Sequence, residues 1–123
     1  MPHCILEFSG NAVDEPDWAE TLGALHRVLA ATGLFVLDDI KSRVVRQGDF
    51  LVGDGRSDRA FVALEIQILS GRPDEVKGEI CDAALEVLVR AFPRTVERLT
   101  TSFTVQISDI HRPSYRREIR SRG

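Results

Sequence analysis

The sequence predicts an α+β fold in two layers: a four-stranded sheet with two helices on one of its faces. Hydrophobic residues divide the 123-residue chain into two similar halves, and each half alternates strand and helix periodicity. Each half is interpreted as a β-α-β unit, whose helix crosses one face of the sheet to reach the next strand. At this length we expect a single domain over residues 1–123, with a basic tail at about 112–123.

The first β-α-β unit begins at the amino terminus. Residues 3–8 carry the β-branched and aromatic side chains that are typical of strands. A helix start signal follows at Asn11 and Asp14, and Gly33 supplies the stop. Residues 40–46 form the second predicted strand. The buried stripe of the helix consists of apolar residues three or four apart, Trp18, Leu22, Leu25 and Leu29.

The second unit repeats this plan after a loop at 48–58, which is marked by Gly-Asp and Asp-Gly pairs. Residues 60–69 (AFVALEIQIL) give the strongest strand signal in the chain. Pro73 is well placed near the first turn of the next helix, and Pro93 interrupts or ends that helix. Residues 102–110 alternate as a strand does. The helix stripe comprises Val76, Ile80, Ala84, Val87 and Leu88.

Two architectures share this order of elements, and periodicity does not separate them. One is the ferredoxin-like split β-α-β arrangement, which is common in ligand-binding and RNA-binding modules. The other consists of two parallel β-α-β units related by a pseudo-twofold axis. Both leave sheet edges and one sheet face without cover, so we expect the chain to form oligomers.

Composition and charge exclude several classes of protein. Hydrophobic residues make up 43% and charged residues 28% of the chain, as in soluble globular proteins. The first thirty residues lack a basic start and a continuous apolar run, and no run approaches the length of a membrane span. We therefore expect a cytoplasmic protein without membrane contact.

The basic tail contrasts with an acidic body. Residues 112–123 hold five arginines and one glutamate, a local charge of +4, which leaves −7 on the rest of a chain whose net charge is −3. The acidic body, and a tail with Tyr115 as its single aromatic residue, argue against nucleic-acid binding. We expect the tail to be solvated or to contact another subunit.

Metal and phosphate motifs are missing from the sequence. Cys4 and Cys81 lie far apart without CxxC spacing, so we expect two buried core thiols and no disulfide. The glycines of the 48–58 loop lack a phosphate-binding pattern, and Phe50 in that loop is expected to pack. Metal-ligand spacing is also absent from the histidines, which we interpret as structural: His3, His26 and His111.

Pro2 is the candidate catalytic residue. A small second residue permits removal of Met1, which would leave a free secondary amine at the chain end. An α-amino group has an ordinary pKa of ~7.7–8.0, and burial and nearby cations lower that pKa. Because a strand starts at once after Pro2, the amine would be held in place, as a general base must be.

A series of motifs runs along most of the chain: Pro2-His3-x-Ile5-x-Glu7; Leu29-Ala30-Ala31-Thr32-Gly33; Ile40-Lys41-Ser42-Arg43-Val44; Asp54-Gly55 followed by Asp58-x-Ala60-Phe61-Val62; Gly71-Arg72; and Ser102-Phe103 leading to Ile110-His111. In order and spacing they resemble the 5-carboxymethyl-2-hydroxymuconate isomerases of the tautomerase superfamily, whose members use an amino-terminal proline as base. The match is loose after His111.

The resemblance implies the pseudo-twofold architecture, a homotrimer, and active sites at the Pro2 ends. It implies a dicarboxylate or tricarboxylate dienol from aromatic (homoprotocatechuate) catabolism as substrate. The Pro2 nitrogen would take the proton of the 2-hydroxyl and deliver one to C5, without a metal or an organic cofactor. Family members use arginines at positions 41 and 72; Arg72 matches, whereas Lys41 departs from the pattern.

A polyanionic substrate requires fixed cations, and the sequence provides candidates. Lys41 and Arg43 face the same side of a strand, where their charges would lower the pKa of a nearby Pro2 amine. Arg72 precedes a helix, where a cation is unfavourable with the helix dipole, so a binding role explains it better than a structural one. Lysine at 41 keeps the charge but loses the planar guanidinium fork. Arg43 could equally be a solvent-facing strand residue.

The alternative to an isomerase is a non-catalytic ferredoxin-like module that binds ligands or partners. In that interpretation Pro2 is incidental, and a tag fused at the amino terminus would be tolerated.

Overall fold

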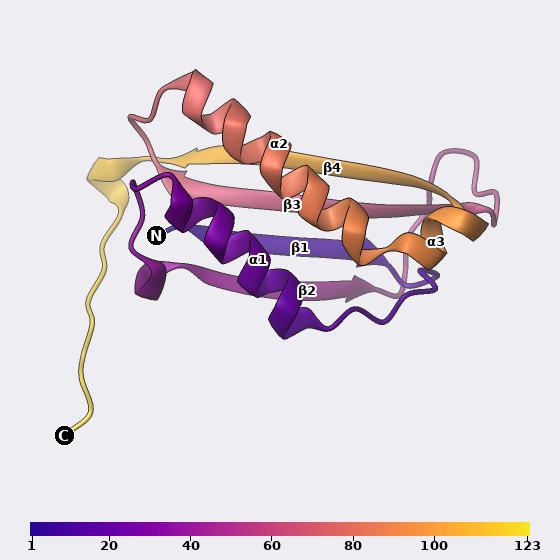
Figure 1. Cartoon of the computed structure of the whole chain (residues 1–123), viewed down its shortest axis with the longest axis horizontal. Coiled ribbons are helices and arrows are strands. Elements are labelled where there is room, and N and C mark those ends of the chain that lie inside the picture. Colours follow the sequence, from indigo (N-terminus) through magenta and orange to yellow (C-terminus); the bar gives the residue numbers. More distant parts are fainter.

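The computed structural model describes residues 1–123. Two main helices, α1 and α2, cover one face of a four-stranded sheet (Figure 1). The elements follow the predicted order: β1 His3–Ser9, α1 Trp18–Ala31, η1 Leu37–Asp39, β2 Lys41–Gln47, β3 Arg59–Leu69, α2 Asp74–Ala91, α3 Pro93–Arg98, β4 Thr100–Ile110 and η2 Arg112–Ser114.

The sheet topology selects one of the two architectures. The strand order is β2-β1-β3-β4; β1 runs parallel to β2 and β3 parallel to β4, while β1 and β3 are antiparallel. In the ferredoxin-like split β-α-β arrangement β3 lies between β1 and β2, and all neighbouring strands are antiparallel. The direct parallel pairing of β1 with β2 and of β3 with β4 therefore excludes it as the fold. The bond from Lys41 N to Pro2 O (3.1 Å) has a counterpart from Thr100 N to Asp58 O (2.9 Å), as two pseudo-symmetric units require.

The core lies between the sheet and the helices. Every second residue of β1 and β3 is buried. Of the predicted helix stripes, Leu25 and Leu29 of α1 and Ile80, Ala84 and Leu88 of α2 are buried, and the other members are partly buried against the core. Cys4 is buried as predicted, but Cys81 on α2 is only partly buried, and both are free thiols. At one end the core is closed by a cluster of aromatic rings, Phe8, Trp18, Phe92 and Phe103.

The start of α1 differs from the sequence prediction. Asp17 is the N-cap, and its side chain accepts a hydrogen bond from Glu20 N. The carboxylate of Asp14 accepts hydrogen bonds from Thr95 N (2.6 Å) and Thr95 Oγ1 (2.7 Å). A short polar residue favours a helix start nearby, but Asp14 binds the first turn of α3 rather than of α1. Pro93 ends α2 and begins α3.

The sheet face opposite the helices carries a polar network. Glu65 accepts hydrogen bonds from Gln67 (2.8 Å), Gln106 (3.2 Å) and Ser108 (3.2 Å). In the single chain no helix packs on this face (Figure 1). None of the helices has the length and apolar character needed to cross a membrane.

Candidate active site

The start of β1, the turn before β2 and the chain after β4 meet at one end of the sheet (Figure 1). They enclose a pocket of about 310 Å³ together with the loop that follows β3. The pocket has an apolar wall and charged groups from four separate segments. It is lined by Met1, Leu34, Phe35, Val36, Asp39, Leu69, Arg72, Tyr115 and Arg117.

The amino terminus lies in this pocket. The Met1 amine donates a hydrogen bond to the backbone oxygen of Asp39 (3.1 Å). Burial lowers the pKa of this amine; the charge of Lys41 lowers it further, Asp39 opposes that shift, and Arg117 adds to it. Pro2 is fully buried directly behind Met1. Pro2 itself does not line the pocket, but it is joined to Met1, which does.

Lys41 is the first residue of β2 and pairs in register with His3. Its Nζ donates to the backbone oxygen of Asp39 (3.0 Å), the oxygen that also accepts from the Met1 amine. Lys41 does not line the pocket itself. It places a positive charge at the rim, next to the chain terminus.

Arg72 lies in the pocket wall, in the turn between β3 and α2, where it follows Gly71 at a φ of 111°. Its guanidinium stacks over the Phe35 ring, 5.5 Å from the centroid. A single long hydrogen bond of 3.5 Å joins Nη2 to Leu34 O, and the buried Nε has no partner. Buried polar atoms are normally paired, so this guanidinium has donors available for an anion.

Arg43 lies apart from the other candidates. Both terminal nitrogens of its guanidinium contact His3 Nδ1 at 3.4 Å, on the sheet face opposite the helices. Burial lowers the pKa of His3, and the charge of Arg43 lowers it further. Within one chain Arg43 therefore acts on His3 and does not reach the pocket.

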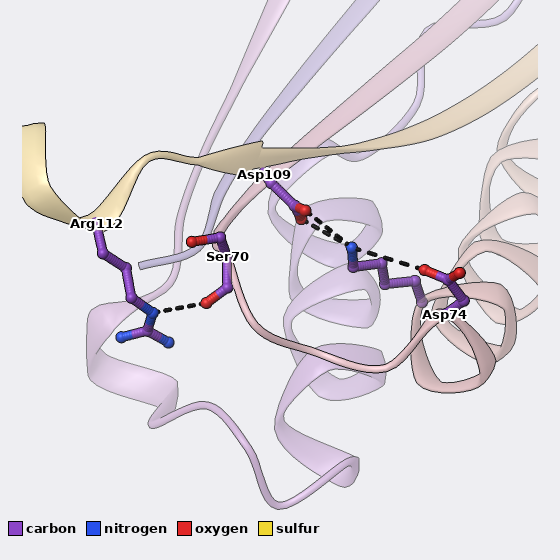
Figure 2. A network of polar contacts seen from close by, with 5 residues as sticks. Ser70, Asp74, Asp109 and Arg112 are labelled. Atoms are coloured by element: carbon purple, nitrogen blue, oxygen red, sulfur yellow. Dashed lines mark hydrogen bonds and ion pairs between the residues drawn. The ribbon is translucent and has the colours of Figure 1, made fainter.

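The sequence did not predict that the tail enters the pocket. Arg112 Nε donates to Ser70 O (2.6 Å), which fixes the chain after β4 beside the turn that carries Arg72 (Figure 2). In the same network Lys77 pairs with Asp109 at 2.9 Å, which joins the start of α2 to the end of β4.

Beyond this anchor Tyr115 and Arg117 line the pocket, and Arg117 Nη1 lies 3.1 Å from Asp39 Oδ1. The only sequence signal for this arrangement was the concentration of arginines behind an acidic body.

The remaining candidates lie outside the pocket. His26 Nε2 and Ser42 Oγ share a hydrogen bond of 2.6 Å between α1 and β2, and His111 Nδ1 bonds Ser114 Oγ at 2.9 Å. Phe50 packs edge-on against Phe61, with ring centroids 6.1 Å apart. These contacts account for the three side chains as structural elements.

The sheet of two parallel β-α-β units, with the chain terminus in a pocket at one end, is the fold of the tautomerase superfamily. The comparisons identify the family within it. Residues 2–122 match the family model of 5-carboxymethyl-2-hydroxymuconate isomerase. The chain therefore belongs to the 5-carboxymethyl-2-hydroxymuconate isomerase family and is an isomerase.

Individual relatives agree with this assignment. The 5-carboxymethyl-2-hydroxymuconate Delta-isomerase of Escherichia coli is 31% identical over 111 residues, which are 90% of this chain and 88% of the relative. The crystal structure of a 5-carboxymethyl-2-hydroxymuconate isomerase from Deinococcus radiodurans R1 has a TM-score of 0.86 at 31% identity, and the match covers 95% of this chain and 88% of that one. A fused 4-OT protein, named as a symmetric trimer, shares the fold with a TM-score of 0.69 at 14% identity, over 89% and 85% of the two chains.

Proposed function

We propose that this isomerase converts 5-carboxymethyl-2-hydroxymuconate, or a similar 2-hydroxymuconate dienol, to its unsaturated 2-oxo form in aromatic (homoprotocatechuate) catabolism. The names of the relatives support this substrate class. The observation that carries the proposal is the environment of the chain terminus. There, burial and the charge of Lys41 lower the pKa of an α-amine in a pocket that also holds Arg72.

Pro2 acts as general base and then as general acid after Met1 has been removed. Its neutral nitrogen takes the proton of the 2-hydroxyl, and the electrons of that O–H bond form the C2=O double bond. The C2=C3 pair moves to C3=C4, and the C4=C5 pair takes a proton from the proline at C5. Protons and electrons balance, so the cycle requires neither a metal nor an organic cofactor. Positioned acid–base catalysis of this kind contributes ~10²–10⁴-fold in rate.

Arg72 and Lys41 bind substrate carboxylates. The half-buried guanidinium of Arg72 can grip a carboxylate with two parallel hydrogen bonds, and its buried Nε has no competing partner. Lys41 contributes a point charge at the rim. Its charge lowers the pKa of the Met1 amine, and a Pro2 amine next to it would be shifted in the same direction. Arg43 is left out of these contacts, because its guanidinium faces His3 on the other side of the sheet.

We propose a homotrimer with one active site at each Pro2 end. The uncovered face of the sheet supports an assembly, since a second copy of the chain could cover it. A relative named as a symmetric trimer has the same fold. The trimer is proposed to be cytoplasmic, with each subunit a single domain.

The test combines the intact mass of the untagged protein with a spectrophotometric assay of ketonisation on both dienols. We expect a mass that lacks one methionine, and activity that is lost in Pro2→Ala and in a variant with one residue added before Pro2. The added residue leaves every side chain in place and blocks only the amine. Wild-type turnover in the blocked variant would refute the proline mechanism, and inactivity of the unblocked protein on both dienols would refute the proposed substrate class.

A further inference from the structure

The tail adds a second arginine to the pocket, which already holds Arg72 and has Lys41 at its rim. Arg117 lines the pocket together with Arg72, and its side chain is 41% exposed. The tail is not free to leave, because Arg112 Nε binds Ser70 O and the η2 turn follows directly. The segment that carries Arg117 is thus fixed to the turn that carries Arg72.

Asp39 orients Arg117 without using up its donors. One terminal nitrogen, Nη1, pairs with Asp39 Oδ1 at 3.1 Å, and the guanidinium makes no other hydrogen bond or ion pair. A guanidinium has five N–H donors in a planar fork, so its remaining edge can bind an anion. The net charge of the site is positive, because it has one carboxylate, Asp39, and three basic side chains, Lys41, Arg72 and Arg117.

We propose that Arg117 is a specificity-determining residue that binds the third carboxylate of a tricarboxylate dienol. Three cations then match three carboxylates, with Arg72 and Lys41 holding the two that every 2-hydroxymuconate carries. Arg117 recognises the additional carboxymethyl arm. This inference rests on the proposed function for its substrate, and it concerns a residue that lies outside the motifs of the family resemblance.

The test compares kcat/KM for 5-carboxymethyl-2-hydroxymuconate with kcat/KM for 2-hydroxymuconate, which lacks the arm. In Arg117→Ala we expect the preference for the tricarboxylate to fall about tenfold, mainly through KM. That is the lower range for a charged hydrogen bond, chosen because Arg117 is partly exposed and screened by water. Arg117→Lys should retain part of the preference. Arg122→Ala is the matched control, because it removes one positive charge from the same tail but outside the pocket. It should leave kcat/KM unchanged for both substrates.

Calorimetric binding of unreactive acids separates this inference from the proposed reaction. Tricarballylate should bind Arg117→Ala about tenfold more weakly than the unsubstituted protein, while glutarate binds both equally. If neither dienol reacts but this pattern holds, the proposed reaction fails and the role of Arg117 stands. If the dienols react and Arg117→Ala keeps both the substrate preference and the tricarballylate affinity, the role of Arg117 is overturned. Equal losses for both acids would also overturn it, since they would indicate a general effect of charge.

Discussion

Replacement of Arg72 by alanine should lower catalytic activity strongly while changing the free energy of unfolding only slightly. In the free protein Arg72 makes one long hydrogen bond of 3.5 Å and stacks on Phe35. A hydrogen bond of that length contributes little, and an exposed cation–π pair contributes about 0.5–1 kcal/mol. Loss of the side chain also removes a buried Nε that has no partner, which offsets part of the cost. We therefore expect Arg72→Ala to lower the free energy of unfolding by about 1 kcal/mol or less.

The effect on catalysis should be much larger. A hydrogen bond to a charged group contributes about 1.5–3 kcal/mol, so loss of a two-bond grip on a carboxylate should cost about 3 kcal/mol or more. At ~1.4 kcal/mol for each factor of ten, kcat/KM should fall about a hundredfold on both dienols. Arg72→Lys should recover only part of this loss, because an ammonium group cannot form the planar fork.

The assay pairs steady-state kinetics with urea unfolding of the same preparations, and Arg122→Ala serves as the control for loss of one positive charge. A kcat/KM within a factor of about three of the unsubstituted protein, well under 1 kcal/mol, would refute the substrate contact. A loss of several kcal/mol in unfolding free energy would equally refute the reasoning, because it would make Arg72 a structural residue.

Further outcomes are expected at the amine and in the fold. Because the base must be neutral, kcat/KM should rise with pH through the amine pKa, with a midpoint below the ordinary α-amino range of ~7.7–8.0. In Lys41→Ala this midpoint should move to higher pH, because the charge of Lys41 lowers the amine pKa. Both midpoints are measured from pH–rate profiles. Lys41→Arg should lower KM for both dienols in steady-state kinetics, since it restores the fork. Thr95→Val should lower the free energy of unfolding in urea by about 2 kcal/mol, because Val13 N, Asp14 N and the Asp14 carboxylate lose their bonds to Oγ1. Burial alone raises the pKa of Asp14, but hydrogen bonds from Thr95 and Arg94 bring that pKa below the ordinary value. The ionised Asp14 carboxylate should therefore stabilise the fold at neutral pH, and this stabilisation should be lost as pH falls through the folded-state pKa. Measurements of the free energy of unfolding across an acid titration test this.

Local patterns in the sequence predicted the elements to within a few residues. Side-chain periodicity and the prolines at 73 and 93 carry that information in each segment by itself. The strand partners were not predictable in this way, because parallel and antiparallel neighbours bury the same alternating residues. The order of motifs in the family resemblance selected the correct architecture, which periodicity alone left open.

The sequence predicted only those residues of the candidate site whose positions follow from strand pairing or from the motifs of the family resemblance. Pro2 and Lys41 are neighbours because β1 and β2 pair in parallel from their first residues. Arg72 was predicted because it belongs to the Gly71-Arg72 motif of the family resemblance, which follows β3. The position of Arg117 in the pocket was not predicted, because the tail has no hydrophobic periodicity. Single polar contacts, such as the hydrogen bond from Arg112 Nε to Ser70 O, determine the path of the tail. A contact of that kind leaves no pattern in the sequence.

The pseudo-twofold relation places the chemistry proposed for Pro2 at one end of the sheet only. The backbone bonds of Lys41 to Pro2 and of Thr100 to Asp58 make Asp58 the counterpart of Pro2 and Thr100 the counterpart of Lys41. Asp58 lies inside the chain, so its nitrogen is an amide and has no basicity, and Thr100 carries no charge. The two units share their backbone plan, but the proposed removal of Met1 would free an amine only in the unit that contains Pro2, and Met1 lines the same pocket as Arg72 and Arg117.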